Sequence, residues 1–149
     1  MSLEEEIKQD KFRSEYQKAA INLLYTGNWL YSINAAFLKT YQITPEQFNV
    51  LRILRGSHPQ SLMLMEISSR MLDKNSNCTR LVEKLKQKGL LLREISDASR
   101  RQVDISITEK GLSLLSKIDA EGPAWIKTMK SITRLEAQEL NRILDKLRS

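Results

Sequence analysis

Apolar residues recur with helical spacing over the first 41 residues of the chain, where proline is absent. Side chains three and four positions apart share one face of an α-helix, so this spacing predicts an amphipathic helical arm. Gly27-Asn28 interrupts the pattern, and glycine in a helix interior costs about 1 kcal/mol relative to alanine. The segment therefore predicts two helices, 4–25 and 28–41, whose apolar stripes need a partner.

Residues 44–71 carry the signals of a second group of elements. Thr44 is a good helix N-cap, Pro45 suits the first helical position, and Gln47 can complete a capping box. The apolar stripe that follows predicts a helix. Residues 61–63 then predict a short strand, and residues 64–71 a two-turn helix with small polar side chains near its end.

The stretch from residue 73 to residue 101 is the most informative part of the chain. Asp73 can cap a helix by accepting from the open N–H groups of its first turn, and Gly89 suits the position after the helix end. Between them, one apolar stripe is formed by Cys78, Leu81, Val82 and Leu85. The pattern predicts a helix over 74–88 in which Cys78 has a packing role.

A β-hairpin is predicted directly after this helix. Residues 90–95 form an apolar run, and residues 102–107 alternate between apolar and polar, as in a half-buried strand. The polar segment SDASRR between them predicts a turn that carries Arg100 and Arg101 at the hairpin tip. Two short helices followed by a basic hairpin have the layout of a winged helix-turn-helix.

Three further signals organise the C-terminal part. Thr108 caps a helix, Gly122-Pro123 interrupts it, and the capping box that begins at Thr133 opens a final helix. The fold class is thus mostly α with a small β-hairpin wing. Apolar stripes at 3–38 and 125–147 have no partner within the predicted elements, so we expect a homodimer. The expected domains are an arm (1–43), a winged helix-turn-helix lobe (44–111) and C-terminal dimerisation helices (112–149).

The face of the 74–88 helix opposite the apolar stripe has the chemistry of a DNA-reading surface. Its amides and hydroxyls can bond base edges, and its cations can bond guanine and phosphate. The candidates are Asn75, Ser76, Asn77, Thr79, Arg80 and Lys84. An ordinary solvated helix face would also be polar, but the basic hairpin that follows favours the DNA-binding interpretation.

The charge distribution agrees with a nucleic-acid partner. The chain has 24 Lys and Arg against 18 Asp and Glu, a net charge of +6. Residues 73–101 hold eight basic and four acidic residues, a net of +4, so most of the excess lies in this segment. A basic membrane-surface helix is the rival interpretation, which the interleaved acids and the hairpin weaken.

Several classes of function are disfavoured by what the chain lacks. One histidine and one cysteine provide no metal cluster, no Cys–His pair and no serine triad, and there is no glycine-rich phosphate loop. We therefore expect no enzyme activity, no cofactor and no metal. Neither a run of about 18 apolar residues nor a secretory signal occurs, and the single cysteine suits a reducing cytoplasm.

These motifs together resemble one family. The segments TPEQFNVLRIL, LMEISSRML, TRLVEKLKQKGLL, SRR and ISITEKG follow one another as in the MarR family of bacterial transcription regulators. The resemblance implies a homodimer with a recognition helix in the major groove of double-stranded DNA and a wing arginine in the minor groove. The recognition-helix positions fall on Asn75, Ser76, Asn77, Thr79 and Arg80, and the wing arginine on Arg101.

The chain departs from the family at the wing, and it leaves the effector open. The family often has an acid two residues before the wing arginine, where this chain has Ser99; Asp97 is the nearest substitute. Many relatives release DNA when a small aromatic ligand binds between arm and lobe, and Tyr25, Trp29 and Trp125 are the aromatic candidates here. The alternative function is a winged-helix module that binds protein instead of DNA.

Overall fold

The computed structural model describes residues 1–96 and 99–149, and only the backbone of Ser99, Arg100 and Ala124. It is mostly helical, with one small antiparallel sheet. The elements are α1 (Leu3–Ile7), α2 (Glu15–Lys39), α3 (Pro45–Ser57), β1 (Leu62–Met63), α4 (Leu64–Arg70), α5 (Cys78–Gln87), β2 (Leu91–Ser96), β3 (Ser99–Ile107), α6 (Glu109–Glu121), α7 (Ala124–Met129) and α8 (Arg134–Arg148).

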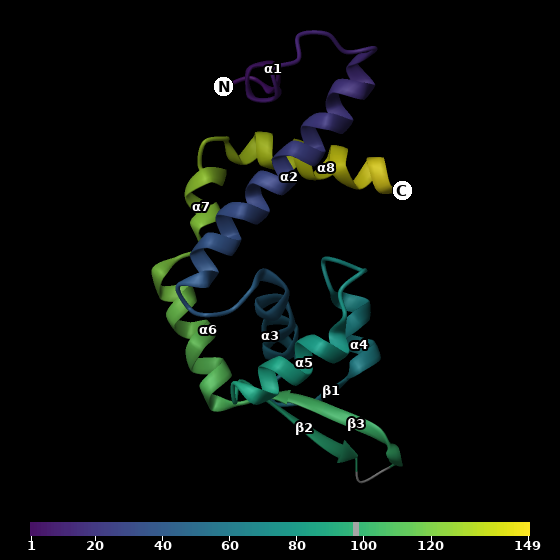
Figure 1. Cartoon of the computed structure of the whole chain (residues 1–149), viewed down its shortest axis with the longest axis vertical. Helices are drawn as coiled ribbons and strands as arrows, with labels where there is room; N and C mark the ends of the chain where they lie inside the picture. Colours follow the sequence, from purple (N-terminus) through teal and green to yellow (C-terminus); the bar gives the residue numbers. More distant parts are fainter. Residues whose placement is uncertain (97–98) are drawn as a thin grey trace.

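The molecule is long, with an arm at one end and a lobe at the other (Figure 1). The arm consists of α1, α2, α7 and α8 and carries both termini. The lobe contains α3, α4, α5 and the sheet, and the β2–β3 hairpin projects from its far end. Helix α6 runs along one side and connects the lobe to α7. No helix within the described ranges is long and apolar enough to cross a membrane.

The predicted break in the arm at Gly27-Asn28 is wrong. Helix α2 continues through Gly27, where no atom outside the helix lies within 4 Å of an added Cβ. The cost of a single exposed glycine is about 1 kcal/mol, and the packing of α2 against α7 and α3 offsets it. The chain instead breaks after Lys8, which is left-handed. Ser14 then caps α2 by accepting from the Gln17 N–H at 3.1 Å.

The helix starts at Thr44, Thr108 and Thr133 are confirmed, whereas the start predicted at Asp73 is wrong. The Asp73 carboxylate accepts from the N–H of Asn75 at 2.9 Å and closes a local turn. The cap of α5 is Asn77, whose side-chain oxygen accepts from the Arg80 N–H at 3.2 Å. Helix α5 therefore begins at Cys78 and ends before Gly89, which has the positive φ expected there.

The sheet has the strand order β1–β3–β2, with both pairs antiparallel. The short strand predicted at 61–63 is present as β1, where Leu62 pairs with Ile105. Strand β2 has the predicted length but lies one residue further along the chain, and β3 is longer than predicted because it begins at Ser99. Arg100 and Arg101 thus belong to β3, which corrects the prediction that they lie in the turn.

One hydrophobic core joins the lobe to the arm. Its central side chains are at most 1% exposed: Leu51 and Leu54 of α3, Leu85 of α5, Leu91 of β2 and Ile105 of β3. Leu38 at the end of α2 and Leu115 and Ile118 of α6 belong to the same cluster. Cys78 is buried in it, as predicted. Because the core includes residues of α2 and α6, it fixes how the arm is attached to the lobe.

Candidate nucleic-acid interface

The N-terminal end of α5 presents the predicted DNA-reading side chains. Thr79, Arg80 and Lys84 are exposed on the face of α5 opposite the buried Val82 and Leu85. Among the described residues, neither Arg80 nor Lys84 has an acidic partner. A cation without an internal partner remains available for phosphate or base contacts, so this face meets the requirements of a reading surface.

Asn75, Ser76 and Asn77 precede the helix and do not form part of its face. Asn77 uses its side-chain oxygen to cap α5, which leaves its amide NH₂ free to donate. The Ser76 hydroxyl is buried and has no hydrogen-bond partner within the described part of the chain. The structure thus keeps these residues beside Thr79 and Arg80, on a turn instead of on the helix.

The hairpin supplies the second set of cations. Arg101 is exposed on β3. Arg93 of β2, which the sequence analysis did not single out, forms an ion pair with Glu83 of α5 at 3.4 Å. This pair connects the hairpin to the exposed side of α5. The side chains of Arg100 and Ser99, and all of Asp97, lie outside the described residues.

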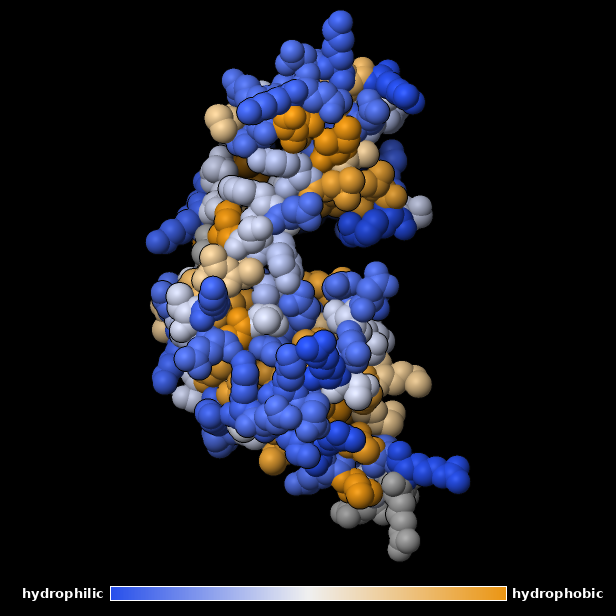
Figure 2. Space-filling model, in the orientation of Figure 1, coloured by the Kyte–Doolittle hydropathy of each residue, from blue (hydrophilic) through white to orange (hydrophobic). Residues whose placement is uncertain are grey.

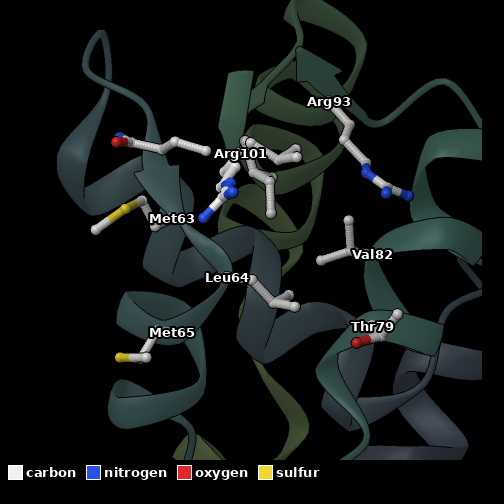
Figure 3. Close-up of a pocket in the computed structure, with 10 residues that line it drawn as sticks. Met63, Leu64, Met65, Thr79, Val82, Arg93 and Arg101 are labelled. Atoms are coloured by element: carbon white, nitrogen blue, oxygen red, sulfur yellow. The ribbon is translucent and has the colours of Figure 1, made fainter. Parts of the chain in front are cut away.

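A hollow of about 410 Å³ separates α5 from the hairpin (Figure 3). Thr79 and Val82 line it from α5, Leu64 from α4, and Arg93 and Arg101 from the strands. In the close-up, Arg93 extends from its strand toward α5, whereas Arg101 lies on the side of the hollow where Met63 is found. The hollow thus brings together two of the predicted DNA-binding residues, Thr79 of α5 and Arg101 of β3.

A second pocket, of about 490 Å³, lies between the arm and the lobe. Its walls come from α2, α3, α7 and the turn at residues 71–73. Trp125 lines it as predicted for a ligand-binding residue, but Tyr25 and Trp29 do not. The Tyr25 hydroxyl donates to Glu6 of α1 at 2.7 Å, which raises the pKa of Tyr25. Trp29 is 44% exposed.

The pocket also contains residues that the sequence analysis did not identify as a site. The Tyr31 hydroxyl donates to the Glu46 carboxylate at 2.6 Å, and Asp73 and Arg52 also line the pocket. These four residues come from three separate segments of the chain, namely α2, α3 and the turn before α5, so no sequence motif could have grouped them.

Comparisons with known proteins identify the family to which the chain is similar. A family model described as "MarR family" matches residues 43–103. The transcriptional regulator MhqR of Bacillus subtilis is 36% identical over 100 residues, which cover 66% of this chain and 66% of that protein, just under two thirds of its length. A MarR transcription factor from Planctomyces limnophilus is 27% identical, with a TM-score of 0.67, and the match covers 93% of this chain and 98% of that one.

A further solved structure shows the fold alone. The organohalide-sensing regulator RdhR, crystallised with 2,4-dichlorophenol, has a TM-score of 0.79 at 20% identity, and the match covers 94% of this chain and 85% of that one. The lobe, with its two-helix unit, recognition helix and hairpin, defines a winged helix-turn-helix protein. Together with the sequence matches, it shows that the chain belongs to the MarR family.

Proposed function

We propose that this protein is a sequence-specific double-stranded DNA-binding transcription regulator. The observation that carries the proposal is the start of α5, where the exposed Thr79 and Arg80 follow the Asn77 cap and Thr79 lines the same hollow as the hairpin arginine Arg101. Polar side chains of this kind read base edges in the major groove, and an arginine on a wing can enter the minor groove. The cytoplasm is the compartment that this role requires.

The active unit is a homodimer held by the arm. Helix α8 has no buried residue, although Leu140, Ile143 and Leu147 lie along one side of it. Figure 2 shows hydrophobic side chains gathered over the end of the molecule that carries α2 and α8. Exposed apolar patches of this kind are typical of protein interfaces, and a second copy offers a matching surface under two-fold symmetry.

A small effector bound in the arm–lobe pocket regulates DNA binding. The pocket is lined by α2 and α7 of the arm and by α3 of the lobe, so an occupant would contact both parts of the molecule. The 2,4-dichlorophenol in the RdhR structure is an aromatic ligand of a protein with the same fold. Of the aromatic residues predicted for this role, Trp125 is the one placed to contact such a ligand.

Selection from a random pool of DNA duplexes tests the regulator proposal. We expect the protein to enrich one sequence and to bind it at least about a thousand-fold more tightly than scrambled DNA. The affinity should fall steeply with salt, because phosphate contacts release counterions. A protein that enriches no sequence and shows no salt-dependent DNA binding would be a protein-interaction module instead.

A further inference from the structure

We propose that the arm–lobe pocket binds a lipophilic cation, such as an ammonium group on an aromatic or branched apolar body, in preference to a phenolate or a carboxylate. The inference rests on the proposed effector site and adds the charge of its ligand. It is carried by the acids of the pocket wall, by the hydrogen bond between Tyr31 and Glu46, and by the aromatic side chains that surround them.

Two carboxylates and one guanidinium line the pocket. Glu46, in the first turn of α3, is half-buried, so solvent screens its charge less than that of an exposed acid. Asp73 lies on the turn before α5. The ammonium of the neighbouring Lys74 donates to the backbone carbonyl of Ser69, and Lys74 forms no ion pair with Asp73 among the described residues.

The guanidinium of Arg52 occupies a different position. It lies over the ring of Phe48, 5.8 Å from the centroid, in a cation–π contact. Arg52 is exposed, so it belongs to the rim of the pocket where water screens it. The net charge of the described lining is negative, and the less screened charge is the carboxylate of Glu46.

Tyr31 reports the local field. Its hydrogen bond to Glu46, partial burial, and the charges of Glu46 and Asp73 raise its pKa to about 12. Both carboxylates therefore disfavour a phenolate at this point of the pocket. The same field would disfavour the anion of a bound phenol and stabilise a bound ammonium group.

The remaining walls suit an apolar body with a cationic head. Leu30, Met71 and Met129 are apolar, and Trp125 and Phe48 are aromatic. Trp is the best cation–π partner among the side chains. A volume of about 490 Å³ lies within the range of drug-sized ligand pockets, roughly 300–1,000 Å³.

Three probes that share one body but differ in charge test the proposal: 4-phenylbutylammonium, 4-phenylbutan-1-ol and 4-phenylbutanoate. Binding is followed by fluorescence in a Trp29→Phe variant, where Trp125 of the pocket is the remaining tryptophan. We expect the cation to bind about 10-fold more tightly than the alcohol and the carboxylate to bind most weakly. A carboxylate that binds as tightly as the cation, or no binding of any probe at millimolar concentration, overturns the proposal.

Two variants of the pocket and one control variant test whether the carboxylates of the pocket produce the preference for the cation. Glu46→Gln keeps an acceptor for Tyr31, and Asp73→Asn keeps the acceptor that closes its turn, so both should fold. Each should lower the affinity for the cation about five-fold or more while leaving the alcohol unchanged. Glu109→Gln removes one exposed acid of α6 outside the pocket and should leave the affinity for the cation unchanged. If this variant loses as much affinity as the other two, the preference for the cation comes from the overall charge of the protein.

The measurement needs no DNA, so it is independent of the regulator proposal. A protein that binds its selected duplex but shows no preference for the cation would retain its proposed function and lose this inference. A protein that prefers the cation but binds no DNA would keep this inference and lose its proposed function.

Discussion

Arg80 and Arg101 stand on different elements, and their losses should differ. Arg80 lies on the exposed face of α5, where a bidentate bond to guanine contributes about 1–3 kcal/mol of discrimination. Arg80→Ala should therefore weaken the selected site much more than scrambled DNA. Arg101→Ala should weaken both duplexes similarly and reduce the salt slope by about 0.9, because a minor-groove contact reads charge and width more than sequence.

Titrations on both duplexes at two salt concentrations measure this difference. Arg13→Ala, which removes a cation from the segment before α2, is the control and should change neither affinity. Equal losses on the two duplexes for Arg80→Ala would remove Arg80 from the base-reading residues.

Tyr31 should remain protonated well above the usual pH range of a tyrosine. Its pKa is raised to about 12, whereas an unfolded chain ionises near 10. The stabilisation from the protonated hydroxyl is thus present below pH 10 and is lost as the pH rises toward 12. At pH 11, the absorbance difference between the protein and the Tyr31→Phe variant should show that Tyr31 is only about one-tenth ionised. If Tyr31 is instead about nine-tenths ionised at this pH, its hydrogen bond to Glu46 does not raise its pKa.

At the scale of elements, the start of α5 depends on the Asn77 cap. Asn77→Ala leaves the N–H of Arg80 without its acceptor and should lower the free energy of unfolding by about 1 kcal/mol. The side chain of Asn75 has no such role, since its contact with Asp73 is made by its backbone N–H. Asn75→Ala should change stability by less than about 0.5 kcal/mol. Urea unfolding of the two variants compares them directly, and equal losses would mean that Asn77 is not the cap.

The boundaries of the elements show what the sequence could predict. Thr44, Thr108 and Thr133 are each followed at once by a helix, and the local pattern was sufficient because cap and helix are adjacent. Asp73 and Asn77 could each cap a helix, but the Asp73 side chain closes a turn with the N–H of Asn75 and Asn77 caps α5. The sequence pattern did not distinguish these two alternatives. Gly27 misled for a different reason, since an exposed glycine weakens a helix without ending it.

The two candidate sites differ in how predictable they were. The residues proposed to read DNA lie within 30 positions of one another on consecutive elements, so they could be grouped from the sequence alone. The arm–lobe pocket draws Tyr31, Glu46, Asp73 and Trp125 from four segments that only the folded chain brings together. Of the three aromatic residues predicted to bind a ligand, only Trp125 lines that pocket among the described residues, and its role in binding stays a prediction.

At the scale of the whole molecule, the exposed stripe of the arm should make the protein a dimer. Leu147 of α8 is 66% exposed and Leu24 of α2 is 70% exposed. The double variant Leu24→Glu/Leu147→Glu places charges on this surface, and burying unpaired charge in an interface is strongly unfavourable. We expect the protein to sediment as a dimer at micromolar concentration and the variant as a monomer. Leu92→Glu, the same change at a half-exposed position on the hairpin, should remain dimeric; a wild-type monomer would exclude the dimer.

The proposed dimer would determine the form of the DNA site. In a two-fold dimer the axis relates the two copies of α5, so both helices would face one side of the duplex and read the same sequence in opposite directions. The selected site should therefore be a near-palindrome whose half-site centres lie one helical turn apart, about 10–10.5 base pairs. Inserting five base pairs between the half-sites rotates one of them by about half a turn away from its helix and should reduce binding to the level of a single half-site. Inserting ten restores the rotation but not the distance, and the arm, whose attachment is fixed by Leu38 and Leu115 in the shared core, should not extend to recover it. A single asymmetric half-site in the selected sequences, or full binding after the five-base-pair insertion, would contradict the symmetric dimer as the DNA-binding unit.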